Sequence, residues 1–251
     1  TIQEFFQEHP VCAVAFSGGV DSAVLLSAAA AYAKRTAAYF VKTPFQPDFE
    51  LADARETAQR LAVPLTVLEV DILSVPEVAA NPADRCYYCK RALFTLLLEA
   101  AEADGFPLVL DGGNASDDAS DRPGMRALRE LGVRSPLREC GVTKAEVRRL
   151  ARAAGLPVWD KPSYACLATR VPAGTAITRR DLDRIARGEA LLASLGLSDF
   201  RLRLRGEDGL LQVREEQFEL ARQILAESPA TLAADFRKIV LDGLPRISRE
   251  T

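Results

Sequence analysis

The sequence has almost no histidine: His9 is the only one in 251 residues. A serine–histidine–aspartate triad needs a histidine base, and imidazole is the commonest metal ligand in proteins. A triad and a histidine-based metal site are therefore close to excluded. The chain also lacks an apolar run near the roughly 18 residues that can cross a membrane. Its first residues are not a basic segment followed by an apolar one, so we expect no signal peptide and no membrane partner.

An excess of positive charge is missing as well. The chain has 32 Lys and Arg against 35 Asp and Glu, for a net charge of −3. Proteins that bind nucleic acid usually carry a basic face, so we expect no nucleic-acid partner. Hydrophobic residues make up 48% of the chain and charged residues 27%, which is ordinary for a soluble globular protein. We expect a cytoplasmic protein with one large α/β domain, or with a medium and a small domain.

Cysteine occurs five times, an odd number that does not suit a disulfide framework. Cys86 and Cys89 form a C-x₂-C pair at the start of a predicted helix, where two thiolates can share a metal or cluster. The second such pair that a structural zinc site needs is absent, and the flanking pattern does not fit a thioredoxin-like redox pair. With Cys166, three thiolates could bind three irons of a [4Fe–4S] cluster and leave the fourth iron open. The alternative is three independent thiols, and we interpret Cys12 and Cys140 as structural or incidental.

The stretch from Val11 to Leu26 predicts a strand, a glycine turn and a helix in succession. Residues 11–16 are an apolar run with β-branched members, as in a central parallel strand. Residues 23–33 are rich in alanine and leucine, which favour a helix. Between them, Ser17-Gly-Gly-Val-Asp-Ser22 would direct unpaired backbone N–H groups and two hydroxyls at a bound phosphate. It is not a Walker A loop, because no Gly-Lys-Ser/Thr follows, and the plain alternative is a turn with a helix cap at Asp21 or Ser22.

The alternation of strands and helices continues after this stretch. It predicts a doubly wound parallel α/β sheet with a smaller C-terminal α+β domain, divided as residues 1–162 and 163–251. Ligands in such sheets bind at the carboxyl ends of the strands. Further strands are predicted at 37–42, 65–70, 108–110 and 133–137, and then, beyond a helix at 178–195, at 200–204, 210–214 and 236–241.

Two further patterns suggest anion sites. A second glycine turn, Gly112-Gly-Asn114-x-x-Asp117, follows a strand of the same predicted sheet and should face the same cleft; its alternative is a turn without function. Arg201, Arg203 and Arg205 alternate with leucine, which places the three guanidinium groups on one face of a strand. Such a face can bind phosphate or carboxylate, or can simply pair with Glu207, Asp208 or Glu215.

The Ser17–Ser22 loop resembles the PP-loop of the ATP pyrophosphatases, which cleave ATP to AMP and pyrophosphate. Together the motifs resemble one branch of these enzymes, the LarE family of sulfur transferases that act in nickel-pincer nucleotide biosynthesis. The resemblance covers nearly the whole chain. It is carried by residues 17–22, 84–90, 112–117, 122–124, 130–137, 161–170 and 201–203.

This resemblance implies an ATP- and Mg²⁺-dependent enzyme. It would adenylate the carboxylates of pyridinium-3,5-biscarboxylic acid mononucleotide and then insert sulfur to give thiocarboxylates. Some members sacrifice the sulfur of a cysteine at the position of Cys166, whereas members with two more cysteines hold a [4Fe–4S] cluster that relays sulfide. The presence of Cys86 and Cys89 places this chain in the second group.

The resemblance also assigns residues and partners. The catalytic residues are Cys166 and Asp21, with Asp21 near magnesium, and the cluster ligands are Cys86, Cys89 and Cys166. Implied partners are a sulfide donor, a downstream nickel-inserting protein and further copies of the chain in a homo-oligomer. ATP would contact Ser17, Gly18, Gly19, Val20, Asp21, Ser22, Gly113, Asn114 and Asp117, and the substrate would contact Arg201, Arg203 and Glu189.

Three alternatives stay open. A tRNA thiolase also combines a PP-loop with paired cysteines, but it would need a basic face for RNA. Sulfur could come from Cys166 itself, without a cluster. A sensor could keep the nucleotide site and lack turnover. The tail 241–251 departs from the acidic-Gly-Tyr-Arg-Ser-Gly ending that is common in LarE-like chains, which puts its role in doubt.

Overall fold

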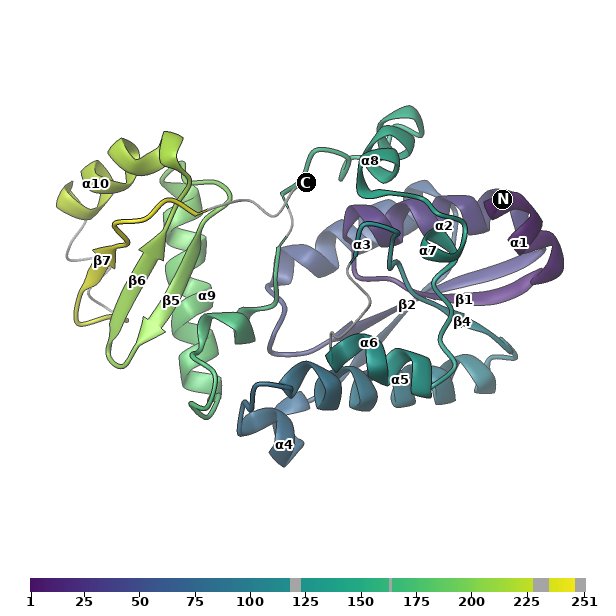
Figure 1. The fold of residues 1–251 in the computed structure, drawn as a ribbon, viewed down its shortest axis with the longest axis horizontal. Helices are drawn as coiled ribbons and strands as arrows, with labels where there is room; N and C mark the ends of the chain where they lie inside the picture. The colour runs from purple at the N-terminus through teal and green to yellow at the C-terminus, as the bar shows by residue number, and fades with distance from the viewer. Residues whose placement is uncertain (118–122, 163, 228–234, 247–251) are drawn as a thin grey trace. The chain divides into compact units, whose positions relative to one another are not determined.

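The computed structural model describes residues 1–117, 123–162, 164–227 and 235–246 (Figure 1). The chain divides into two compact units, each with its own sheet. Unit 1 comprises Thr1–Val78 and Asp84–Lys161, and unit 2 comprises Ala79–Ala83 and Pro162–Thr251. Arg122, Ser163 and the tail from residue 247, all part of the sequence interpretation, lie outside the described residues.

Unit 1 contains a parallel four-stranded sheet in the order β3-β2-β1-β4. The chain adds strands outward from β1 to β3 and then returns to place β4 on the other side of β1. This order confirms the predicted doubly wound α/β fold, and it puts the topological switch point, where such sheets bind ligands, between β1 and β4. The strands are β1 (Val11–Ala15), β2 (Arg35–Lys42), β3 (Leu65–Glu69) and β4 (Val109–Leu110).

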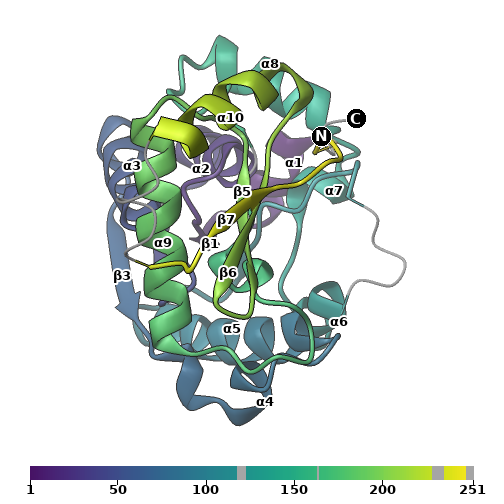
Figure 2. The same ribbon diagram turned by 90° about the vertical axis from the view of Figure 1, so that its left-hand side faces the viewer.

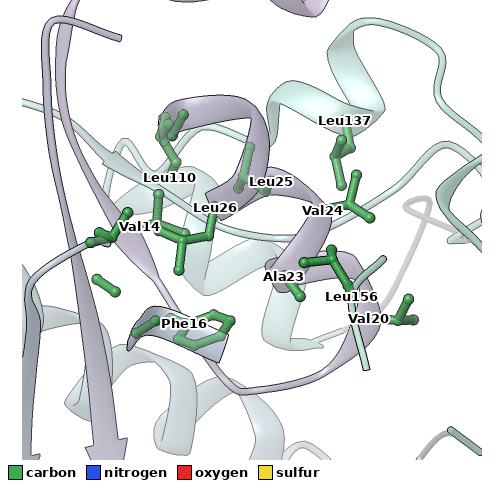
Figure 3. Packing of buried hydrophobic residues seen from close by; sticks show 14 of the residues in the cluster. Val14, Phe16, Val20, Ala23, Val24, Leu25, Leu26, Leu110, Leu137 and Leu156 are labelled. Atoms are coloured by element: carbon green, nitrogen blue, oxygen red, sulfur yellow. The ribbon is translucent and has the colours of Figure 1, made fainter. Parts of the chain in front are cut away.

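Helices cover both faces of this sheet (Figure 1). Residues alternate along β1, so that Cys12 and Val14 belong to the core under α2 whereas Ala13 belongs to the core under α5. Figure 3 shows Val14 and Phe16 packed beneath the apolar face of α2. The first face carries α1 (Ile2–Glu8), α2 (Val20–Tyr32), α3 (Asp48–Arg60), α7 (Pro136–Glu139) and α8 (Lys144–Ala153), and the second carries α5 (Arg85–Ala103) and α6 (Pro123–Glu130).

The prediction of a strand at 133–137 is wrong. Arg134 alone forms a parallel bridge with Leu110, and α7 begins at Pro136. Proline has no N–H for a strand ladder, and its fixed φ suits the first position of a helix. Similarly, α5 begins at Arg85 rather than near Cys89, so both cysteines of the C-x₂-C pair lie within the helix.

Unit 2 has the predicted α+β composition (Figure 2). Strands β5 (Arg201–Arg205) and β6 (Asp208–Gln212) form an antiparallel hairpin, and β7 (Ile239–Leu241) pairs parallel with β6. Helix α9 (Arg179–Ser194) lies against β5. The remaining elements are α10 (Phe218–Glu227) in unit 2, α4 (Pro76–Ala79), and the 3-10 turns η1 (Ile72–Ser74), η2 (Leu167–Arg170) and η3 (Glu215–Gln217).

The segment 79–83 joins unit 2 through the buried side chain of Asn81. Its Nδ2 donates to the carbonyls of Pro172 and Thr175, at 2.9 and 3.1 Å, and its own carbonyl accepts from the N–H of Gly174. In the described part of the chain, no helix is both long and apolar enough to span a membrane.

Candidate active site

The Ser17–Ser22 loop forms the expected tight turn between β1 and α2. Gly18 has φ +77°, and a Cβ there would lie 2.9 Å from the carbonyl oxygen of Glu50, so the turn needs glycine. Gly19 caps α2 without any side-chain hydrogen bond. The buried Ser22 hydroxyl donates to the Gly19 carbonyl at 3.0 Å and accepts from the Ser17 N–H at 3.3 Å. Ser22 thus shapes the loop from inside, and the N-terminal amides of α2 are left to bind an anion.

The second glycine turn contacts this loop, as the sequence predicts. A Cβ on Gly112 would lie 2.8 Å from the Ser22 backbone nitrogen, so glycine permits the close approach of the turn to α2. Asn114 Nδ2 donates to Asp21 Oδ1 at 2.9 Å, and the Asn114 N–H donates to Asp117 Oδ2 at 2.9 Å. The loops after β1 and β4 therefore form one hydrogen-bonded group at the switch point of the sheet.

Two cations that sequence reasoning missed complete this group. Lys144 Nζ lies 2.6 Å from Asp21 Oδ2, and Arg138 Nη2 lies 3.6 Å from Asp117 Oδ2. Lys144 is the first residue of α8, whose start the Thr143–Glu146 capping box fixes. The Thr-x-x-Glu pattern of this capping box can be found in the sequence, but the short distance from Lys144 to Asp21 depends on tertiary structure.

These loops and the two cations are suited to bind a nucleoside triphosphate with magnesium. Backbone amides of the loop and the cations Lys144 and Arg138 can bind phosphate oxygens. Carboxylate oxygens are suitable ligands for Mg²⁺, and the Asp21 side chain is 25% exposed and so partly accessible. Asp117, with a side chain that is 37% exposed, is a second carboxylate at the same place.

The three predicted cluster cysteines are distributed over both units. Cys86 is exposed and Cys89 half-buried, one turn apart on α5 in unit 1, so their thiols share a helix face. Cys166, also half-buried, precedes η2 in unit 2. Within the described residues, no group of three His, Cys, Asp or Glu side chains is arranged to hold a metal ion. The pair on α5 can supply two ligands, and a three-cysteine cluster stays a prediction.

The arginine strand of unit 2 is β5. Burial, together with the nearby charges of Arg170 and Arg246, lowers the pKa of Arg201 to about 10, and the same causes lower the pKa of Arg203. Two guanidinium groups that are costly to keep charged suit a site for an anion. Two of the three acidic residues in the ion-pair alternative have other partners: Asp208 pairs with Arg237 at 2.8 Å and Glu207 with Arg184 at 3.6 Å.

Glu189 is buried behind this strand. Its carboxylate accepts hydrogen bonds from Arg170 Nε at 2.8 Å and from the Leu202 N–H at 2.9 Å. Tyr164 donates to it as well. Arg170, which is 1% exposed, also donates to the carbonyl of Ala165 at 2.7 Å. This arrangement favours a positioning role for Glu189, in which the Arg170–Glu189 pair ties the segment around Cys166 to β5.

The sequence is similar to those of several known proteins. Residues 5–119, which span both glycine turns, match the asparagine synthase family model. The pyridinium-3,5-bisthiocarboxylic acid mononucleotide synthase of Lactiplantibacillus plantarum is 32% identical over 80% of this chain and 74% of its own length. An uncharacterised protein of Synechocystis is 36% identical over 87% of this chain and 82% of its own length. The tRNA-cytidine(32) 2-sulfurtransferase of Bdellovibrio bacteriovorus is 28% identical over 41% of this chain and 42% of its own length.

The match to the Lactiplantibacillus synthase extends over most of both chains. It confirms the resemblance that the motifs indicated and the prediction that the protein is an enzyme. The chain belongs to the LarE family of PP-loop proteins, which are ATP-dependent sulfurtransferases.

Proposed function

We propose that the protein uses ATP to insert sulfur into the carboxylates of pyridinium-3,5-biscarboxylic acid mononucleotide. The observation that carries the proposal is the similarity to the Lactiplantibacillus synthase over most of both chains. The geometry supports it in each unit separately. Unit 1 has a phosphate-binding loop with carboxylates and cations, and unit 2 has a strand with two partly desolvated arginines.

The first half of the reaction is adenylation. A substrate carboxylate oxygen attacks the α-phosphorus of ATP, the bond from that phosphorus to the bridging oxygen breaks, and pyrophosphate leaves. The loop amides and Lys144 would bind the phosphate oxygens and hold the leaving group in line. Asp21 and Asp117 would hold magnesium, which neutralises phosphate charge when bound.

The second half is acyl transfer to sulfur. A sulfur nucleophile attacks the acyl carbon of the adenylate, and AMP leaves with the former carboxylate oxygen. Each carboxylate therefore consumes one ATP and becomes a thiocarboxylate. Arg201 and Arg203 would bind the phosphate of the mononucleotide, since guanidinium groups bind phosphate bidentately.

The sulfur source is the finer part of the proposal. A [4Fe–4S] cluster on Cys86, Cys89 and Cys166 is supported by the cysteine pattern and by the shared helix face of Cys86 and Cys89. Protein purified without oxygen should contain about four irons per chain with matching sulfide. Cys86→Ala and Cys166→Ala should each lose that iron.

The contrary result has a clear signature. If reconstituted protein holds no iron, the sulfur comes from Cys166 itself. Turnover then converts that residue to dehydroalanine, and the intact protein loses the mass of hydrogen sulfide. Normal sulfur transfer by Cys86→Ala would also reject the three-cysteine cluster.

A tRNA thiolase is the second candidate, favoured by the partial similarity to the tRNA-cytidine(32) 2-sulfurtransferase. Salt-dependent retardation of tRNA on a gel would support it. An assay of pyrophosphate release with each substrate distinguishes the two candidate functions. We expect the pyridinium mononucleotide, and not tRNA, to stimulate pyrophosphate release. Stimulation by tRNA alone would reject our proposal. No release with either substrate would indicate a sensor.

A further inference from the structure

Unit 1 contains a cavity of about 370 Å³, and one of the residues that line it, Arg138, contacts the second glycine turn. The cavity is formed where the chain returns from α6 to α7 at the edge of the parallel sheet, and three arginines line it. Arg134 is already neutralised, because its Nε donates to both carboxylate oxygens of Glu139, at 2.9 and 3.1 Å. Arg129 is exposed in the last turn of α6. The third arginine, Arg138, is in a different situation.

Arg138 is held against Gly113. Its backbone N–H donates to the Gly113 carbonyl at 3.1 Å. Its guanidinium lies so close that a Cβ on Gly113 would be 3.0 Å from Nη2. Glycine at this position therefore leaves room for the guanidinium beside the turn.

The hydrogen-bonding capacity of this guanidinium is poorly used. Nε is buried and, within the described residues, has no partner. Nη1 and Nη2 lie 4.0 and 3.9 Å from the Met125 sulfur, which is only a weak acceptor. The 3.6 Å separation from Asp117 allows an ion pair without a direct hydrogen bond. Guanidinium donors in such a place normally have strong acceptors, so this guanidinium is able to bind an additional oxyanion.

The second glycine turn also contacts the Ser17–Ser22 loop. Gly112 touches the backbone of Ser22, and Asn114 donates to Asp21. Arg138 is thus separated from the phosphate-binding loop by one turn of chain, at the carboxyl end of β4 where the reacting groups are expected to meet.

We propose that Arg138 binds an oxyanion of the reacting pair, either the α-phosphate of ATP or the carboxylate that is adenylated. The carboxylate source rests on the proposed function, whereas the phosphate source needs only ATP binding. A bound oxyanion would give this guanidinium a strong acceptor, and Arg138 would supply a fixed positive charge where the adenylate forms.

The test compares Arg138→Gln with Arg129→Gln in the full chain. Both variants remove one positive charge from the cavity wall, but only Arg138 contacts the glycine turn. Binding of α,β-methylene ATP is measured by calorimetry, and KM for the mononucleotide by pyrophosphate release. If Arg138 contacts the α-phosphate, Arg138→Gln should weaken analogue binding about tenfold or more, while Arg129→Gln does not. If it contacts the carboxylate, analogue binding stays unchanged and KM rises by that factor.

The inference is overturned if Arg138→Gln changes neither analogue binding nor KM for the mononucleotide. If the wild-type protein does not turn over the mononucleotide, unchanged analogue binding in Arg138→Gln is enough to overturn it. Thermal melting checks that the variant is folded. If it is not, Arg138→Lys replaces it, because lysine keeps the charge but cannot bind an oxyanion bidentately. Weakened analogue binding in a protein that does not process the mononucleotide would support Arg138 and reject the proposed substrate.

Discussion

Lys144 is the single residue whose position adds most to the proposed nucleotide site. It comes from the start of α8, yet its ammonium lies 2.6 Å from an Asp21 oxygen, and both side chains are half-buried. Removal of one partner of such a pair leaves the other charge without compensation. Neither residue type is unusual for its place in the sequence, and only the packing of α8 on α2 brings the two together.

Lys144→Ala should therefore weaken ATP binding about tenfold, because a phosphate loses one charge-assisted contact and Asp21 loses its counter-ion. Equilibrium binding of the same ATP analogue measures the effect. Arg149→Ala removes an exposed cation from the same helix and is the matched control. Equal affinities of the two variants would contradict the assignment of Lys144.

Arg201 should bind the substrate and not ATP. Arg201→Ala is expected to raise KM for the mononucleotide about tenfold or more and to leave ATP affinity unchanged, since a phosphate loses one guanidinium partner. Arg205→Ala, at an exposed position on the same strand, should change neither quantity. An unaffected KM in Arg201→Ala would mean that β5 is only a structural strand.

The thiols should differ sharply in reactivity. Burial raises the pKa of Cys12 to about 11, so its reactive thiolate is scarce at neutral pH and increases only as pH rises toward that value. Cys86 is exposed. Mild alkylation of cluster-free protein at pH 7, followed by peptide mass mapping, should label Cys86 and spare Cys12. Equal labelling of both in folded protein would show that β1 is not buried as described.

At the scale of elements, local signals predicted most of the fold. The strand, glycine turn and helix from Val11 onward each have their own residue preferences, and the structure confirms all three. The sequence reasoning failed at 133–137, where an apolar run resembled a strand but Pro136 begins a short helix. It also did not foresee α1, although Thr1 and Glu4 form a capping box there.

The approach of α9 to β5 depends on Gly188. A Cβ there would lie 2.6 Å from Leu202 Cδ2 and 3.0 Å from the Phe236 ring, both buried. Gly188→Ala should thus lower the free energy of unfolding by about 1–3 kcal/mol through overpacking. Chemical denaturation measures this change, and Gly243→Ala, which meets no atom within 4 Å, is the control. Equal stability of Gly188→Ala and wild type would contradict the described packing.

At the scale of the whole molecule, the predicted functional residues divide between two units. The proposed nucleotide-binding residues and the Cys86–Cys89 pair belong to unit 1, whereas Cys166 and the arginine strand belong to unit 2. The glycine turns were predictable because a positive φ or a close backbone approach excludes most residues other than glycine. Lys144, Arg138 and the Arg170–Glu189 pair were not, because lysines, arginines and glutamates on helices are usually solvated and only tertiary contacts distinguish these few.

The most direct test of the account is the mass of the mononucleotide after reaction. Protein prepared without oxygen is incubated with ATP, Mg²⁺, sulfide and pyridinium-3,5-biscarboxylic acid mononucleotide, with Asp21→Asn as the control. We predict that carboxylate oxygen is replaced by sulfur, with one AMP and one pyrophosphate released for each replacement, and that the control forms no product. Hydrolysis of ATP with the mononucleotide mass unchanged would contradict the central claim.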